Sequence, residues 1–440
     1  MLSPHVPAPL LPQILSAAIF IITFIFIISE RVHRTVIAMA GAVLVVLLGH
    51  FFGFYSIELA FEAIDFHTLT LLAGMMIMVV VLEQTGFLEF LAIKSAQKAR
   101  GNPWLLMVAL GTVTTLVSFI LDNVTTVVII APVTILIAKI TRISATPLLM
   151  AEALLSDTGG VATLVGDPPN VMIGSAAHFS FNEFITHVAP IVIVAWGATL
   201  LVLKFVYHKE LAKKPDHLDD LMNWDASKSI TNKGDIYKTL GVLVLVIFLF
   251  FFHNLIHLEP SMVAIIGATL TLLLVTLRKD PQPIMEKVEW SVLAFFISLF
   301  ILVGALEHAG IIDHLTRAIV NHSGNNIVVT AIIILWVSAF ASAIIDNIPF
   351  TMAMIPVIQQ MGADGIETNL LWWALALGVG FGGNGSPIGS TANVVVVSKS
   401  AETDEPITFK TWFKSGTLAT IATCIVATVA ILLFHEWMAR

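Results

Sequence analysis

The 440-residue sequence has one cysteine and very little charge. Its single cysteine, Cys424, excludes a disulfide framework and a cysteine-based metal cluster. Only 12% of the residues are Asp, Glu, Lys or Arg, whereas 57% are hydrophobic and the mean hydropathy is +0.93, which excludes a soluble globular protein. The 22 basic and 30 acidic residues give a net charge of −8 without a basic tail or patch, and we therefore expect no nucleic-acid partner.

Long apolar stretches occupy most of the chain. About twelve of them, each roughly 15 to 20 residues long, approach the length of about 20 residues that crosses the hydrocarbon core of a bilayer. Residues 14–28 and 241–252 are examples. We predict an all-α, polytopic membrane protein with roughly 10 to 12 transmembrane segments, whose surroundings are the lipid bilayer.

The basic residues predict the orientation. Groups of Lys and Arg alternate along the chain with connections that carry none, such as 58–65, 176–187 and 253–260. When the chain is threaded by the positive-inside rule, 20 of the 22 basic residues, all except Arg317 and Arg440, lie on the cytoplasmic side. We expect an integral protein of a prokaryotic plasma (inner) membrane with both termini outside.

One long polar segment separates two halves of the chain. Residues 209–238 contain Pro215 and five aspartates, and seven lysines lie between Lys204 and Lys238. We predict a first membrane repeat at 1–207, a cytoplasmic linker at 208–238 and a second, inverted membrane repeat at 239–440. The linker is interpreted as a plain solvated loop rather than as a regulatory segment.

The two halves share an internal repeat. At an offset of 224 residues, 82–86 (LEQTG) matches 306–310 (LEHAG), Asp122-Asn123 matches Asp346-Asn347, and Pro132 matches Pro356. At an offset of 223, Gly159-Gly160 matches Gly382-Gly383, Gly166 matches Gly389, and Asn170 matches Asn393. Two related units that each cross the membrane an odd number of times must be inserted in opposite orientations. We predict inverted repeats of about five transmembrane helices plus one hairpin each, with broken helices at the midplane, which is a plan of secondary transporters.

The first polar element of each repeat is a short tip between apolar arms, at 118–126 and 342–351, and this pattern predicts a hairpin. An aspartate costs about 2.5–3.5 kcal/mol at the centre of a membrane helix, so a retained Asp-Asn pair should face a cavity. The alternative is that both aspartates only cap a helix. Occurrence in both repeats favours a shared ion or substrate site, for which we select Asp122, Asn123, Thr125, Thr126, Asp346, Asn347 and Thr351.

The second polar element of each repeat is rich in glycine and proline, at 152–170 and 378–393. Such a density breaks a helix, and exposed backbone at membrane depth must be buried in protein or line a wet cavity. The expected breaks are at Gly159, Gly160, Pro168, Pro169, Gly382, Gly383 and Pro387. The expected site residues are Asp157, Thr163, Gly166, Asp167, Asn170, Asn384, Ser386, Ser390 and Asn393. The alternative is that these glycines serve only close helix packing.

The four polar segments contain no Lys or Arg that could pair with their acids. A carboxylate without a partner in low dielectric must take up a proton, bind a cation or find several hydrogen-bond donors. We therefore expect a site that alternates between a coupling ion, H⁺ or Na⁺, and a cargo, with Asp122 and Asp157 as the favoured titrating groups. No other cofactor is expected. The spacing of the histidines matches no metal site, and we predict no bound metal.

The runs 122–126 (DNVTT), 166–170 (GDPPN), 346–351 (DNIPFT) and 382–385 (GGNG) together resemble the arsenite permease and P-protein branch of the ion transporter superfamily. The resemblance covers most of the chain from about Glu30, with the four motifs in the same order. It implies a scaffold and a transport domain, two hairpins, ion ligands at the hairpin tips and unwound helices, and elevator-type alternating access. It further implies proton-coupled efflux of arsenite or antimonite. Arsenite is a neutral hydroxide at pH 7 and suits a site of hydroxyl, amide and carboxyl groups.

Two other functions remain open, and a third is rejected. A Na⁺/H⁺ antiporter and a P-protein-like chloride channel or anion transporter share these motifs. An intramembrane aspartyl protease is suggested by 164–167 (LVGD), but that motif would need Gly at position 164 and a Tyr-Asp partner, which the sequence lacks. We therefore expect no enzyme. The sequence also leaves the assembly open between a single chain and a homodimer.

Overall fold

A computed structural model describes residues 9–29, 31–213, 215–277, 279–314, 316–317 and 326–440. The rest, including residues 1–8 of the predicted first repeat and 318–325 of the second, lie outside the described residues. The described chain is helical and contains no strand. Nine of its helices are long and apolar enough to cross a membrane. The predicted all-α, polytopic fold is confirmed.

The first half of the chain contains eleven described helices. In chain order they are α1 (Leu10–Ser29), α2 (Arg34–Phe52), α3 (Ile57–Glu62), α4 (Phe66–Gln84), α5 (Phe87–Lys98), α6 (Pro103–Ser118), α7 (Asn123–Thr141), α8 (Thr146–Gly160), α9 (Pro168–Ala177), α10 (Phe181–His187) and α11 (Ala189–Val206). The polar segment that follows contains α12 (Leu218–Met222) and the short 3₁₀ helix η1 (Ala226–Ser229).

The second half repeats this order. Its described helices are α13 (Lys233–Phe252), α14 (Pro260–Thr276), α15 (Gln282–Met285), α16 (Trp290–Ala309), α18 (Ile327–Ile344), α19 (Asn347–Ala363), α20 (Asn369–Gly383), α21 (Thr391–Ser400), α22 (Phe409–Trp412), the π-helical turn η2 (Phe413–Thr417) and α23 (Leu418–Met438). The α8–α9 and α20–α21 pairs begin and end 223 residues apart, as the sequence repeat predicts. The repeated order of elements and both helix breaks are therefore present in the fold.

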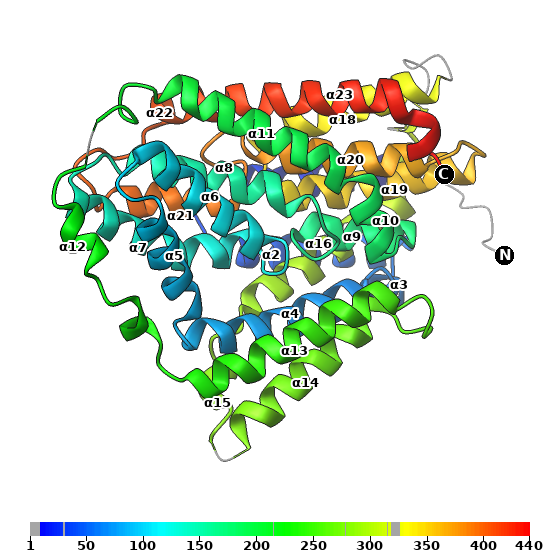
Figure 1. Ribbon diagram of the computed structural model, residues 1–440. Helices are drawn as coiled ribbons and strands as arrows, with labels where there is room; N and C mark the ends of the chain where they lie inside the picture. Colours follow the sequence, from blue (N-terminus) through cyan, green and yellow to red (C-terminus); the bar gives the residue numbers. More distant parts are fainter. Residues whose placement is uncertain (1–8, 30, 214, 278, 315, 318–325) are drawn as a thin grey trace.

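The helices pack as two bundles (Figure 1). We call α1, α2, α4, α13, α14 and α16 the scaffold bundle, because these helices pack mainly against one another. We call α6–α9, α11, α18–α21 and α23 the hairpin bundle, which holds both hairpins and both broken helices. Figure 1 shows α4, α13 and α14 of the scaffold bundle in the lower part of the view, and α11, α18, α20 and α23 of the hairpin bundle in the upper part.

The linker is mostly exposed, but it is anchored to the helices at two points. The side chains of Leu221 and Ala226 are buried. The Gln97 Nε2 amide of α5 donates hydrogen bonds to the carbonyls of Leu221 (3.0 Å) and Trp224 (2.8 Å). These two apolar side chains and two hydrogen bonds hold the segment against α5 and α7. The sequence of the linker is dominated by charged residues and does not reveal these contacts.

The close approach of α18 and α20 depends on glycine at position 382. A Cβ atom there would lie 2.5 Å from the carbonyl oxygen and 2.6 Å from the Cα of Ala339. Because backbone cannot move aside as a side chain can, we expect Gly382→Ala to destabilise the protein by about 1–3 kcal/mol. Gly197→Ala in α11 is the matched control, since nothing lies within 4 Å of its Cβ position. Thermal unfolding of the purified proteins in detergent measures both; equal transition temperatures would contradict the prediction.

Candidate functional site

The two hairpin tips end in aspartates that cap the following helices. Asp122 Oδ1 accepts a hydrogen bond from the Thr125 backbone N–H (2.9 Å), and Oδ2 accepts one from the Thr125 hydroxyl (2.7 Å). Asp346 Oδ1 accepts one from the backbone N–H of Ile348 (3.3 Å). Capping satisfies N–H groups that a helix start leaves free. The capping that we considered as an alternative is thus present at both tips, although Asp122 also lines a cavity.

Asp157 is the point where the two halves of the chain meet. Its Oδ1 accepts hydrogen bonds from Asn123 Nδ2 of the first hairpin (2.7 Å) and from Ser390 Oγ of the second half (3.1 Å). The carboxylate is buried, and its Oδ2 has no hydrogen-bond partner among the described residues. A buried oxygen without a donor is costly unless a proton or a cation occupies it.

Asp167 makes the reciprocal connection. It lies in the first half, directly before α9, and it is buried. The amide Nδ2 of Asn347, at the tip of the second hairpin, lies 3.2 Å from its Oδ2. Each hairpin thus contributes one Asn to an acid of the first broken helix. The two acids share one junction between the repeats.

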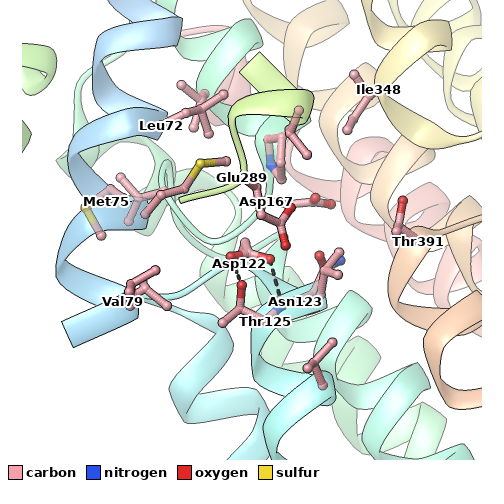
Figure 2. A pocket seen from close by; sticks show the side chains of 18 of the residues that line it. Leu72, Met75, Val79, Asp122, Asn123, Thr125, Asp167, Glu289, Ile348 and Thr391 are labelled. Atoms are coloured by element: carbon pink, nitrogen blue, oxygen red, sulfur yellow. Dashed lines mark hydrogen bonds between the residues drawn. The ribbon is translucent and has the colours of Figure 1, made fainter. Parts of the chain in front are cut away.

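A cavity of about 330 Å³ lies beside this junction, between the two bundles. We call it the carboxylate pocket. Its polar lining comprises Arg34, Glu83, Asp122, Asn123, Thr125, Asp167, Lys287, Glu289, Asn347, Ser390 and Thr391. Figure 2 shows Asp122, Asn123 and Asp167 at its centre, with Met75 and Val79 of α4 on one side and Thr391 on the other. Six of the predicted site residues therefore line one cavity.

Asp346 is paired with a cation, which corrects our expectation that the acids have no basic partner. The Nη1 of Arg34 lies 2.9 Å from Asp346 Oδ2 and 2.7 Å from Thr391 Oγ1. The Thr391 hydroxyl also donates to Asp346 Oδ2 (3.0 Å). Arg34 starts α2 of the scaffold bundle, so this contact joins the two bundles. The absence of Lys and Arg within the four segments did not exclude a cation that arrives from another helix.

The remaining predicted site residues do not line the carboxylate pocket, and most of them bond to backbone. The hydroxyls of Thr126, Thr163 and Thr351 donate to the carbonyls of Asp122, Phe119 and Asn347. Ser386 Oγ accepts from the Ile388 N–H. The amide of Asn384 donates to the Leu154 carbonyl and to Thr158 Oγ1. Gly166 N–H donates to the Thr163 carbonyl within the first break.

Asn170 and Asn393 hold the two breaks closed in the same way. Asn170 Nδ2 donates to the carbonyls of Gly160 (3.2 Å), Val161 (3.1 Å) and Thr163 (2.8 Å). Asn393 Nδ2 donates to the carbonyls of Gly383 (2.8 Å) and Ser386 (3.2 Å). A broken helix leaves carbonyls free, and these amides satisfy them. We therefore assign the two asparagines a structural role: they stabilise the two helix breaks.

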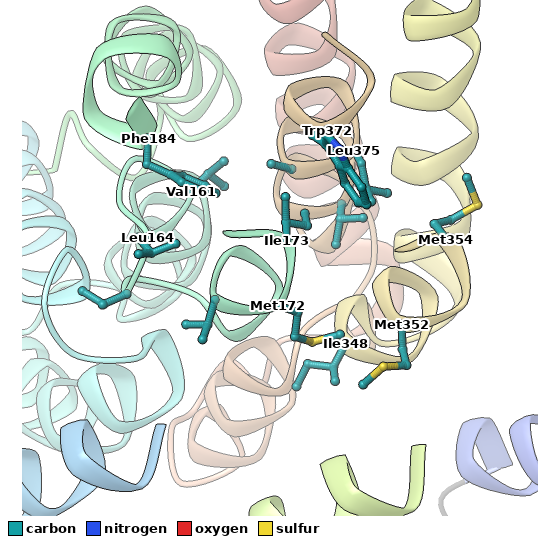
Figure 3. Packing of buried hydrophobic residues seen from close by; sticks show 14 of the residues in the cluster. Val161, Leu164, Met172, Ile173, Phe184, Ile348, Met352, Met354, Trp372 and Leu375 are labelled. Atoms are coloured by element: carbon teal, nitrogen blue, oxygen red, sulfur yellow. The ribbon is translucent and has the colours of Figure 1, made fainter. Parts of the chain in front are cut away.

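An apolar core supports the junction from behind (Figure 3). Val161 and Leu164 from the first break, Met172 and Ile173 from α9, and Ile348 and Met352 from α19 belong to one buried cluster. Trp372 and Leu375 of α20 extend it. Side chains from both repeats thus pack the first break against the start of α19 at the second hairpin tip.

Five polar residues of the carboxylate pocket were not predicted as site residues: Arg34, Glu83, Lys287, Glu289 and Thr391. Thr391 directly follows the predicted Ser390 and corresponds to Pro168 in the repeat. The alignment of the two repeats could therefore have indicated Thr391 as a site residue. Lys287 and Glu289 precede α16 and carry no motif. Among the described residues, no group of three or more His, Cys, Asp and Glu side chains could hold a metal ion.

The citrate transporter family matches residues 24–378 of the chain, including both hairpins and the first break. The chain belongs to this family. This member of the citrate transporter family is 40% identical over 423 residues to an uncharacterized transporter of Mycobacterium tuberculosis, covering 95% of this chain and 97% of that protein. It is 38% identical over 421 residues to a 46 kDa membrane protein of Mycobacterium leprae, covering 94% and 97%. It is thus an integral membrane transporter, as its relatives are named.

The predicted resemblance to the P-protein branch of the ion transporter superfamily is confirmed. This citrate transporter family member is 30% identical to the human P protein over 501 residues, covering 96% of this chain and 60% of that protein. Its fold is similar to that of the YdaH transporter from Alcanivorax borkumensis, described as having an unusual topology, with a TM-score of 0.61 and 99% of each chain covered. At 12% identity this second likeness shows the fold alone.

Proposed function

We propose that this protein is a secondary active transporter in which a coupling ion binds at the junction of the two repeats. The observation that carries the proposal is Asp157, a buried acid held by Asn123 of one repeat and by Ser390 of the other, with one oxygen left without a partner. An ion at this oxygen would contact groups from both halves. Its binding would therefore favour one arrangement of the halves over another, which is what coupling requires.

The coupling ion is H⁺ or Na⁺. Both satisfy a carboxylate oxygen that lacks a donor, and neither needs a permanent metal cluster. Asp122 and Asp167 supply two further carboxylates to the carboxylate pocket beside this junction. Elevator-type movement of the hairpin bundle against the scaffold bundle would carry the junction across the membrane, because the carboxylate pocket lies between these two bundles.

We propose arsenite or antimonite as the first cargo to test, exported against protons. Arg34 is already engaged by Asp346 and Thr391, and the Lys287 ammonium lies 4.0 Å from the Glu83 carboxylate, so the carboxylate pocket offers mainly hydroxyl, amide and carboxyl groups to a neutral hydroxide. Everted vesicles with labelled arsenite and imposed pH or sodium gradients test this. We expect saturable uptake driven by the pH gradient and abolished when the gradient is collapsed. Uptake no faster than in vesicles without the protein would contradict the proposed cargo.

A small anion is the second candidate cargo. Arg34 and Lys287 bring two cations to the carboxylate pocket, and the family is described as citrate transporters. An anion would have to compete with Asp346 for Arg34, and its entry would be helped by prior binding of a cation at Asp157. Labelled citrate and chloride in the same vesicles distinguish this candidate. Sodium-dependent collapse of a pH gradient without either cargo would instead favour the Na⁺/H⁺ antiporter.

The orientation is proposed from the basic residues. The C-terminal end of α4, near Glu83 and Lys287, would face the cytoplasm, and both chain termini would lie outside in a prokaryotic plasma membrane. A homodimer remains a proposal for the assembly, and catalysis is not proposed.

A further inference from the structure

A second cavity of about 450 Å³ lies beside the other end of α4. We call it the histidine pocket, because its lining includes His67, His178, His253 and His257. Its other polar groups are Thr68, Ser175, Ser180, Asn254, Glu259 and Ser261. All lining residues are described, and none is Lys or Arg. The α13–α14 connection and the start of α4 supply one wall, and α9 with the residues after it supplies the other.

The histidine pocket and the carboxylate pocket are neighbours. Both are lined by Leu71 of α4 and by Val171 of α9. The consecutive residues Leu164 and Val165 face different cavities, Leu164 the histidine pocket and Val165 the carboxylate pocket. The barrier between the two cavities is therefore a thin apolar layer that joins the scaffold bundle to the hairpin bundle.

His253 gives the histidine pocket a buried group without a partner. Its side chain is 6% exposed. The Nδ1 lies 3.1 Å from the Leu258 carbonyl and donates to it. In the neutral ring Nε2 is then an acceptor, and this Nε2 has no partner among the described residues. The nearby carboxylate of Glu259 is engaged by His67, with Oε2 2.6 Å from Nδ1. A buried acceptor beside a polar cavity requires a donor such as a hydroxyl group.

We propose that the histidine pocket is a second solute compartment on the transport path, in which His253 Nε2 accepts a hydrogen bond from a small hydroxylated solute. Leu71 and Val171 form the closed gate between this compartment and the carboxylate pocket. The histidine pocket opens to the outside and the carboxylate pocket to the cytoplasm, in the orientation given by the basic residues. The assignment of the solute rests on the proposed function, whereas the two compartments and the gate do not.

Thiol labelling tests the compartments without any transport assay. The only cysteine, Cys424, is buried, so Cys424→Ala gives a background without reactive thiols. Ser175→Cys reports on the histidine pocket and Met76→Cys on the carboxylate pocket. With a membrane-impermeant thiol reagent, we expect Ser175→Cys to react from the outside only and Met76→Cys from the cytoplasmic side only. Both thiols reacting from the same side would overturn the proposal.

The gate is tested by Leu71→Ala in the same two reporter proteins. Removing this side chain should make each thiol reactive from both sides, with a labelling rate from the formerly closed side raised at least about tenfold. Leu69→Ala is the matched control, because Leu69 is a buried residue of α4 that lines neither cavity. Unchanged sidedness in Leu71→Ala, or the same loss of sidedness in Leu69→Ala, would overturn the gate.

The solute site is tested by His253→Gln. With labelled arsenite offered from the histidine-pocket side, we expect KM to rise about fivefold, the size of one lost hydrogen bond. With arsenite offered from the other side, KM should stay within about twofold of wild type. Equal KM changes on both sides, or none, would overturn the role of His253. If the wild-type protein takes up no arsenite, both the proposed cargo and the solute assigned to His253 are wrong. The thiol-labelling experiment still tests whether the two pockets open to opposite sides.

Discussion

Replacing Asp157 by Asn is expected to abolish ion-coupled uptake into everted vesicles, with a loss of roughly 100-fold or more in initial rate. Asn keeps the size of the side chain, but it cannot carry a negative charge or take up a proton. A hydrogen bond to a charged group contributes up to about 3 kcal/mol, which corresponds to roughly two orders of magnitude in rate. The carboxylate of Asp157 is the group whose Oδ2 lacks a partner, so its charge should be needed for the coupling ion.

Asp219→Asn is the control for this substitution. Asp219 is an exposed residue of α12 in the linker, and the same change there should leave uptake within about twofold of wild type. Protein amounts in the vesicles are compared by immunoblot, so that a folding defect is not read as a transport defect. Uptake by Asp157→Asn at the wild-type rate, at equal protein amount, would remove Asp157 from the coupling site.

Replacing Arg34 by Gln is expected to slow transport by roughly tenfold to 100-fold. The change leaves Asp346 without its cation and removes the contact between α2 of the scaffold bundle and the second hairpin. The Arg34 and Asp346 side chains are 26% and 14% exposed, so the pair is only partly screened by solvent. A hydrogen bond to a charged group at such a site contributes about 1.5–3 kcal/mol. Initial rates of uptake measure the loss.

A double-mutant cycle separates the pair from other effects of Arg34. Asp346→Asn alone should also slow transport, since it frees the arginine, and the double variant should lose much less than the product of the two single losses. Arg34→Lys should be intermediate, because an ammonium group keeps the charge but not the planar guanidinium whose Nη1 donates to both Asp346 and Thr391. Single losses that simply multiply in the double variant would show that the two residues act independently.

Much of the fold could be predicted because the repeated motifs lie at the ends of the hairpins and broken helices. The offsets of 224 and 223 residues were read from residues that are rare inside membranes, and the paired helix breaks follow them. Glycine and proline act locally: α8 ends at Gly160, and α9 begins at Pro168. A helix break of this kind depends on residues that are adjacent in the chain, so it can be predicted from the sequence alone.

The site itself was predicted only in part, because some residues that contact one another in it are far apart in the sequence. Arg34 and Asp346 are 312 residues apart, and no spacing rule joins them. Polar residue types also do not reveal the direction of a side chain. Asn123 and Asn347 reach the acids, whereas Asn170 and Asn393 turn to the carbonyls of the breaks. These differences arise from tertiary packing.

The histidines show the same limit. His67, His178, His253 and His257 come from different parts of the chain, and their spacing matches no motif. The fold brings them to one cavity because the start of α4, the end of α9 and the α13–α14 connection meet there. A role for these histidines can be inferred only from the structure, which shows that the three segments line one cavity.

We propose that movement of the cargo across the membrane is coupled to movement of an ion. Purified protein in liposomes, with labelled cargo and internal pH or sodium recorded together, tests it most directly. We predict that adding cargo on one side moves the coupling ion in the opposite direction at a fixed ratio, that the flux saturates, and that Asp157→Asn loses both movements. Cargo flux that proceeds without ion movement and does not saturate would contradict the account. With an anionic cargo such flux would be an ohmic current, which indicates a channel.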